Sequence, residues 1–239
     1  ILVMITSDKC YENKEWNWAY RENDEMGGSD PYSASKGATE LAISSYYRSF
    51  FADNDKMLIA SARAGNVIGG GDWAKNRIIP DLIKCWSEEK LLKIRSPNST
   101  RPWQHVLEPV SGYLNLAWTL YEDQSLNGQS FNFGPDNNDE YTVEELVKKM
   151  SLQWKNAKWK KNEDFNSNLK EASLLKLNCD KSLNLLNWKQ ALNFDETASF
   201  TINWYKIYYQ GNKNIFDIST RQIEDYMSIA NKRNIKWAI

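Results

Sequence analysis

The sequence predicts an α/β protein built on a parallel sheet, because short apolar segments alternate with helical ones. The run ILVMI at 1–5 is unbroken in its apolar character, as in strands buried on both faces of a parallel sheet. A second apolar segment at 57–63 follows a predicted helix and runs into a glycine-rich loop. The order strand, helix, strand, loop, helix is typical of a parallel α/β fold.

Helix and strand signals continue along the chain. Asp30 and Pro31 are typical of an N-cap and a first helical residue, and that helix is predicted to reach residue 51. Thr142 and Glu145 form a predicted capping box, and Gly211 a predicted C-cap. Residues 155–179 carry no clear pattern. The other predicted helices lie at 76–88, 108–121, 195–210 and 219–234, and the other predicted strands lie within 91–106 and 129–135.

The composition indicates a globular protein without an overall basic field. The 239 residues are 41% hydrophobic and 13% aromatic, which supports a packed core. Thirty basic and 31 acidic residues nearly cancel, so we expect neither a nucleic acid nor a membrane as a partner. No apolar run is long enough for a signal peptide or a membrane span.

Cysteine and histidine usage excludes several kinds of site. Cys10, Cys85 and Cys179 are far apart, in no spacing typical of a metal site or a disulfide framework. This pattern favours a reducing, cytoplasmic location. His105 is the only histidine, so a multi-histidine metal site is excluded. We expect no metal, and a structural role for His105.

The first residue lies inside an apolar strand. A strand of this kind is expected in the middle of a sheet, so we expect that sequence upstream of Ile1 is missing. The alternative is a genuine N-terminal edge strand, although edge strands rarely carry so unbroken an apolar set.

Tyr32 and Lys36 lie four positions apart at the start of the first predicted helix, so their side chains share one face. A tyrosine has a pKa of about 10, and a base poised near neutrality needs it lowered by roughly 3 units, or about 4 kcal/mol. A cation at roughly 4 Å contributes on the order of 4 kcal/mol at an effective dielectric constant of about 20. Lys36 is therefore a sufficient cause for a catalytic Tyr32, and an ordinary pair on a solvated helix face is the alternative.

Ser7, Asp8 and Lys9 follow directly after the first predicted strand. Open parallel sheets bind ligands at the carboxyl ends of their strands. A hydroxyl, a carboxylate and an amine at that position, with Tyr32 and Lys36 on the next helix, form a candidate acid/base set.

Four motifs stand in order along the chain: TSDKCY at 6–11, DPYSASKGATE at 30–40, ARAGNVIGGGDW with RIIPD at 62–81, and RPWQHVLEPVSGYL at 101–114. Together they resemble the extended short-chain dehydrogenase/reductase family of NAD-dependent epimerases and dehydratases, and within it the CDP-glucose 4,6-dehydratases. The resemblance implies the C-terminal half of a Rossmann-like parallel sheet with a smaller mixed α/β substrate-binding subdomain.

The resemblance implies a redox-neutral lyase that uses NAD and converts CDP-glucose to CDP-4-keto-6-deoxyglucose with loss of water. Tyr32 would take the proton of the sugar 4-hydroxyl while hydride passes to NAD+, and Lys36 would bind the cofactor ribose and lower the tyrosine pKa. Lys9 would help remove the C5 proton, Asp8 would protonate the departing 6-hydroxyl, and hydride would return from NADH to C6. Ser7 would hydrogen-bond the oxygen at C4.

The same resemblance implies further ligand contacts. An arginine suits a diphosphate because its planar fork donates paired hydrogen bonds, and Arg101 matches the family arginine in that role; an exposed loop arginine is the alternative. In the C-terminal substrate segment Lys170 stands before Glu171, where a histidine is more usual. The implied cofactor contacts also include Thr6, Ala64 and Gly65, and the implied substrate contacts are Asn66, Trp73, Arg77, Arg101 and Glu171.

The residue after Asp8 separates relatives within this family. In the dTDP-glucose dehydratases a glutamate stands there, whereas the epimerases usually lack the acid/base couple. Lys9 therefore favours CDP-glucose, and Asp8 favours dehydration. The alternatives are a dTDP- or GDP-sugar dehydratase, an NDP-sugar epimerase, or a non-catalytic fragment that binds a nucleotide sugar.

No glycine fingerprint of the dinucleotide-binding type occurs in the sequence, although the family binds the NAD pyrophosphate with one. We therefore expect the family's opening half-domain to be absent and this fragment to be inactive alone. Residues 1–135 are expected to be the remainder of the NAD-binding domain interleaved with pocket segments, and 136–239 mainly the substrate-binding subdomain. The full-length protein is expected to be a homodimer that serves O-antigen or lipopolysaccharide synthesis.

Overall fold

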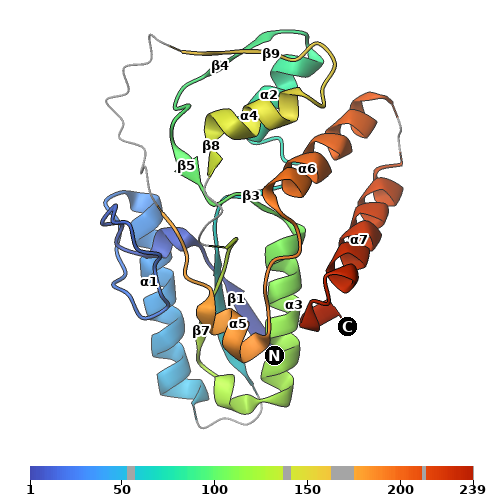
Figure 1. Cartoon of the computed structure of the whole chain (residues 1–239). Helices are drawn as coiled ribbons and strands as arrows, with labels where there is room; N and C mark the ends of the chain where they lie inside the picture. The colour runs from blue at the N-terminus through green and yellow to red at the C-terminus, as the bar shows by residue number, and fades with distance from the viewer. Residues whose placement is uncertain (53–56, 137–140, 163–174, 212–213, 239) are drawn as a thin grey trace.

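A three-stranded parallel sheet forms the centre of the chain in the computed structural model, which describes residues 1–52, 57–136, 141–162, 175–211 and 214–238 (Figure 1). Its strand order is β1-β2-β7. Each strand is joined to the next by a helical crossover, as parallel pairing requires, so the predicted α/β fold with a parallel sheet is confirmed. The strands are Leu2–Ile5 (β1), Ile59–Ala64 (β2) and Ser130–Phe133 (β7).

Helices α1 (Pro31–Tyr46) and α3 (Leu107–Glu122) cover opposite faces of this sheet (Figure 1). Successive side chains of a strand point to opposite faces. Arg63 of β2 reaches α1, where it contacts Glu40. The alanines of β2 instead join the apolar cluster of α3, which includes Leu116 and Leu120. One face of the sheet is therefore polar and the other is apolar.

A second part of the molecule lies beyond the carboxyl ends of the strands, with α7 beside α6 at its edge (Figure 1). Three two-stranded sheets frame it: β3 with β6, β4 with β9, and β5 with β8. Its helices α2, α4 and α6 share the largest apolar cluster. The strands are Val67–Ile68 (β3), Leu91–Ile94 (β4), Thr100–Arg101 (β5), Gln104–His105 (β6), Tyr141–Thr142 (β8) and Lys158–Lys161 (β9). The helices are Ile78–Ser87 (α2), Val143–Ser151 (α4), Phe194–Tyr209 (α6) and Ile215–Lys232 (α7), whereas Asp180–Leu186 (α5) lies beside β7 of the central sheet.

The predicted helices are all present, with ends that differ by a few residues. The first continues past α1 as a π-helical turn, Tyr47–Phe51. The capping box of Thr142 and Glu145 is confirmed, with both reciprocal hydrogen bonds formed. The two-residue strands β3 and β8 were not predicted. Two longer elements also lacked a sequence signal, α5 and β9, because each is short and lies in or next to the unpatterned stretch 155–179.

The predicted first strand is present as β1. Within the described residues β1 pairs with β2 alone and lies at the edge of the sheet. Leu2 and Ile5 are 41% and 58% exposed. Burial on both faces was expected for a sheet that continues into sequence upstream of Ile1, so it stays a prediction.

Across the described helices, none combines the length and the apolar character that a bilayer crossing requires.

Candidate functional site

A cleft of about 560 Å³ opens at the carboxyl ends of β1 and β2. This is the edge at which open parallel sheets bind ligands. Four segments form most of its lining: the residues after β1, the residues after β2, the first turn of α1 and the start of α2. The cleft brings together nine of the residues predicted from the sequence, namely Thr6, Ser7, Asp8, Lys9, Tyr32, Ala64, Gly65, Asn66 and Arg77.

Tyr32 reaches the cleft because α1 begins beside it. The Asp30 carboxylate caps the helix by accepting hydrogen bonds from the backbone N–H groups of Tyr32 at 2.9 Å and Ser33 at 3.0 Å. The Tyr32 side chain is 56% exposed. Lys36 places its Nζ atom 5.6 Å from the centre of the Tyr32 ring, within cation–π range. The two side chains therefore share one helix face, as their spacing predicts.

Asp8 is the buried acid of the cleft, with 3% of its surface exposed. The Ser7 hydroxyl donates a hydrogen bond of 2.9 Å to the Asp8 carboxylate and accepts one of 3.2 Å from the Lys9 backbone N–H. Burial raises the pKa of Asp8 above its usual value, although the Lys9 charge and the Ser7 hydrogen bond oppose it. Asp8 therefore keeps its proton to a higher pH than an ordinary aspartate does.

Gly65 permits the close approach of Asp8 to the end of β2. A Cβ atom at position 65 would lie 1.9 Å from Asp8 Oδ2, much closer than atoms can approach. Any other residue would have to displace the carboxylate or the strand end. The glycine therefore allows the ends of β1 and β2 to meet in the cleft.

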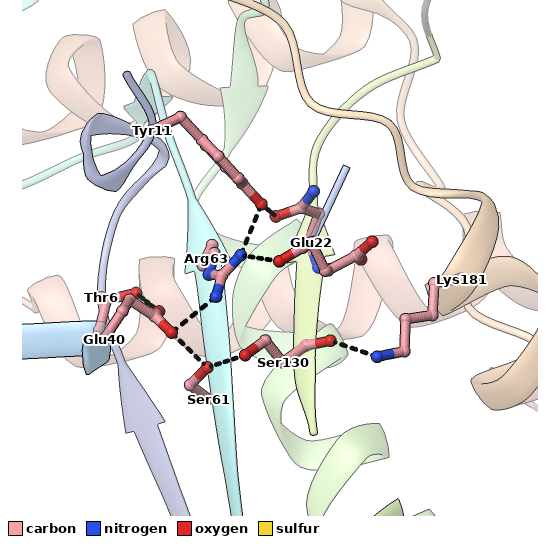
Figure 2. A network of polar contacts seen from close by, with 9 residues as sticks. Thr6, Tyr11, Glu22, Glu40, Ser61, Arg63, Ser130 and Lys181 are labelled. Atoms are coloured by element: carbon pink, nitrogen blue, oxygen red, sulfur yellow. Dashed lines mark hydrogen bonds and ion pairs between the residues drawn. The ribbon is translucent and has the colours of Figure 1, made fainter. Parts of the chain in front are cut away.

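A buried ion pair ties α1 to the central strand (Figure 2). Arg63 Nη2 lies 2.8 Å from Glu40 Oε2, and both side chains are almost completely buried. Ser61 donates a hydrogen bond of 2.9 Å to the same carboxylate, and the Thr6 hydroxyl donates another. Glu40 stands two turns after Tyr32 on the helix, so these contacts fix the helix that carries Tyr32 against the strand ends.

The same network reaches the segment that follows β1 (Figure 2). Arg63 Nη1 donates hydrogen bonds to the Tyr11 hydroxyl at 2.8 Å and to the Glu22 carbonyl at 2.9 Å. The Tyr11 hydroxyl in turn donates a hydrogen bond of 2.7 Å to Asn132 Oδ1 on β7. Arg63 thereby connects β7 to the segment that carries Ser7 and Asp8. Sequence reasoning did not identify Arg63 or Glu40, because they are 23 residues apart and only the fold pairs them.

The remaining predicted residues lie outside this cleft. Arg101 lines a neighbouring cavity of about 160 Å³, which shares Ile78 and Trp103 with the cleft. Trp73 packs against aromatic residues of α6, with its ring 5.4 Å from that of Tyr205, and does not line the cleft. Lys36 does not line the cleft but lies over the ring of Tyr32, which does. Glu171 lies outside the described residues.

Two aromatic residues line the cleft that the sequence reasoning missed, Trp103 and Tyr113. Tyr113 stands in the second turn of α3, whose start faces the carboxyl ends of the strands, and no motif singled it out.

His105 is buried, and burial lowers its pKa to about 4, so the ring is neutral. Its Nδ1 accepts the Leu107 N–H at 3.3 Å. Within the described part of the chain, no cluster of side chains could hold a metal ion.

The fold is that of nucleotide-sugar epimerases and dehydratases. A UDP-glucose 4-epimerase from Stenotrophomonas maltophila, solved with NAD and formylated UDP-arabinopyranose, superposes with a TM-score of 0.73 at 16% identity, over 88% of this chain and 65% of that one. A dTDP-glucose 4,6-dehydratase from Bacillus anthracis, solved with NAD, gives a TM-score of 0.68 at 18% identity, over 89% and 62%. The predicted Rossmann-like character of the fold is thereby confirmed.

In sequence the chain is similar to the CDP-glucose 4,6-dehydratase of Salmonella typhimurium. The two share 46% identity over 232 residues, which are 95% of this chain and 64% of that protein. The resemblance inferred from the four motifs is therefore confirmed, and the chain spans less than two thirds of the relative's length. No family model matches the chain.

Proposed function

We propose that the protein carrying this chain is a nucleotide-sugar 4,6-dehydratase that acts on CDP-glucose with NAD. The observation that carries the proposal is the meeting of Ser7, Asp8 and Lys9 with Tyr32 in one cleft. The 46% identical relative named CDP-glucose 4,6-dehydratase supports it, over 64% of that relative's length.

The cleft suits the part of NAD that would lie next to a sugar. Ala64 and Gly65 present little side-chain bulk at the end of β2, and a Cβ at Gly65 would already meet Asp8. The segment from Thr6 to Ser7 and the pair of Tyr32 and Lys36 would complete the contacts. Bound NAD would supply an acceptor and donor of hydride.

Tyr32 and Ser7 would act on the oxygen at C4 of the sugar. Tyr32 would remove the hydroxyl proton as C4 becomes a ketone, with the Lys36 ammonium group over its ring. The Ser7 hydroxyl would hold the same oxygen. The new ketone makes the neighbouring C5 proton acidic, which allows an amine to remove it.

Lys9 and Asp8 would then complete the loss of water. Lys9 would take the C5 proton, and the C6–O bond would break as the 6-hydroxyl receives the proton of Asp8. The raised pKa of Asp8 suits a general acid, because burial favours the form that carries the proton. The water that leaves would carry the 6-hydroxyl oxygen with its own hydrogen and the proton from Asp8. The hydride removed from C4 would be returned at C6 and C5 would regain a proton, so the reaction would be redox-neutral.

The nucleotide would be held at the rim of the cleft. Asn66 and Arg77 line the cleft, and Arg101 in the adjoining cavity is close enough for its charge to lower the pKa of Asp8. An arginine on either side suits a diphosphate. We assign Trp73 and Glu171 to the same nucleotide site on the strength of the motif resemblance alone.

A nucleotide-sugar epimerase is the second candidate, because epimerases are among the structures that share the fold. Asp8 and Lys9 favour dehydration, since epimerisation at C4 needs no acid for a leaving hydroxyl. A dTDP- or GDP-sugar would be the alternative substrate.

Mass spectrometry of the reaction products tests the function. Two proteins are compared: this chain alone, and the longest product of the same gene that includes this chain. Each is incubated with NAD+ and CDP-, dTDP-, UDP- or GDP-activated sugars. We expect loss of one water from CDP-glucose, and a drop of at least about 100-fold in Tyr32→Phe. Tyr46→Phe is the matched control, because Tyr46 is an exposed tyrosine at the end of the same helix. Absence of turnover from every protein and sugar, or full activity of Tyr32→Phe, would contradict the proposal.

The cellular setting of the protein is part of the same proposal. We place it in the cytoplasm as a homodimer without nucleic-acid or membrane partners. Its product would feed bacterial surface polysaccharide such as the O-antigen of lipopolysaccharide.

A further inference from the structure

A second tyrosine lines the cleft from the side opposite Tyr32. Tyr113 belongs to α3, which covers the apolar face of the sheet, whereas Tyr32 belongs to α1 on the polar face. Tyr113 is half-buried, and Tyr32 is 56% exposed. The two tyrosines therefore line the same cleft, and Tyr113 is the less exposed of the two.

The ring of Tyr113 is held in one orientation. It meets the ring of Phe133 edge-on, with centroids 5.6 Å apart and planes at 86°. Phe133 is itself locked edge-on against Trp188 at 4.9 Å. The neighbouring residue is Gly112, where a Cβ atom would lie 2.4 Å from the Phe133 ring. This close approach of α3 to β7 fixes where the Tyr113 hydroxyl stands.

The Tyr113 hydroxyl differs from those of the fully buried tyrosines. Tyr11 donates to Asn132, Tyr205 to the Asp72 carbonyl and Tyr226 to Glu108, at 2.7 to 2.9 Å. Tyr113 lines the cleft and makes no hydrogen bond to any residue that the structure describes. Its hydroxyl is therefore available to a partner that enters the cleft.

Its surroundings make Tyr113 a donor. Burial raises its pKa to about 12, and Asp8 acts in the same direction whenever its carboxyl group is ionised. Tyr113 therefore keeps its proton at neutral pH. Tyr113 and Asp8 line the same cleft.

We propose that Tyr113 is a substrate-binding residue whose hydroxyl donates a hydrogen bond to an oxygen of the sugar bound beside Asp8. The inference rests on the proposed function, which supplies the nucleotide sugar. Because the hydroxyl contacts the sugar and the arginines contact the diphosphate, loss of the hydroxyl affects the binding of CDP-glucose and leaves the binding of CDP unchanged.

Titration calorimetry with CDP-glucose and with CDP tests this assignment. Tyr113→Phe removes the hydroxyl and keeps the ring contact with Phe133. Both proteins also carry Tyr32→Phe, which prevents turnover during the titration. We expect CDP-glucose to bind about 3- to 10-fold more weakly to the Tyr113→Phe protein, the usual effect of one lost neutral hydrogen bond, with equal affinity for CDP. Tyr121→Phe, an exposed tyrosine on the same helix, is expected to change neither affinity.

The outcomes separate this assignment from the proposed function. Equal affinities of the two proteins for CDP-glucose overturn the role of Tyr113 and leave the proposed function standing. A parallel loss for CDP and CDP-glucose also overturns it, because the effect would then come from the nucleotide site or the fold. Failure of the parent protein to bind any nucleotide sugar overturns both. We expect Tyr113→Phe to unfold at the same temperature as the parent protein, because the ring and its packing remain.

Discussion

The two helices that cover the central sheet each bury one glutamate, and the two carboxylates have different partners. Glu40 of α1 lies 2.8 Å from the guanidinium of Arg63. Glu108 of α3 accepts hydrogen bonds only from uncharged donors among the contacts described, the N–H groups of Ala191 and Leu192 and the hydroxyl of Tyr226.

The partners decide the charge of each carboxylate. Burial by itself would raise the pKa of both carboxyl groups. At Glu40 the hydrogen bond and charge of Arg63 outweigh burial and hold the pKa below its usual value. At Glu108 burial wins, and the pKa rises to about 7 in spite of three hydrogen bonds. Of these two buried carboxylates, the one that is paired with a cation is the one whose ionised form is favoured. That carboxylate is Glu40, which lies on α1, the helix that carries Tyr32.

The largest effect is expected from breaking the ion pair. Arg63→Met leaves the Glu40 carboxylate buried without its cation, which is expected to cost about 3–5 kcal/mol of unfolding free energy. Urea unfolding near neutral pH measures the loss. The double variant Glu40→Leu/Arg63→Met is expected to lose less than the sum of the two single variants, because no unpaired charge remains. Strict additivity would show that the two residues do not act as a pair.

An intermediate effect is expected from the proton of Glu108. Between its usual value of 4.5 and the folded value of about 7, the folded protein binds more protons than the unfolded chain. The contribution of Glu108 is therefore fully present below pH 4.5 and is lost as the pH rises through about 7. The total is at most about 3 kcal/mol, at roughly 1.4 kcal/mol per pKa unit.

Unfolding measured between about pH 4 and 8 checks this sign. Glu108→Gln is expected to flatten the decline toward neutral pH. Glu40→Gln is the matched control, because the lowered pKa of Glu40 makes its contribution disappear only as the pH falls below 4.5. An unchanged profile in Glu108→Gln would contradict the raised pKa.

The smallest effect is expected on the apolar face, from Gly112→Ala. The added methyl group would stand 2.4 Å from the Phe133 ring and would force α3 or the ring to shift. Overpacking of this size is expected to cost about 1–3 kcal/mol, measured as a lower midpoint of thermal unfolding. Glu122→Ala, an exposed position at the end of the same helix, is expected to be nearly neutral, and an equally neutral Gly112→Ala would show that the helix can move away.

Local signals account for the features that were predicted well. The start of α1 follows from Asp30 and Pro31, and the start of α4 from its capping box, because caps act within one turn. The residues after β1 and β2 could be placed together in advance, because parallel strands end at the same edge of a sheet. Nine predicted residues accordingly line one cleft.

The sequence by itself determined the parallel α/β fold, the boundaries of most helices and the edge of the sheet where the cleft lies. These depend on periodicity, caps and strand direction, which a single chain displays locally. Only the tertiary structure decided that Arg63 neutralises Glu40, that Trp73 faces α6, and that Tyr113 enters the cleft. Each depends on which distant atoms surround a side chain, and no spacing along the chain reports those neighbours.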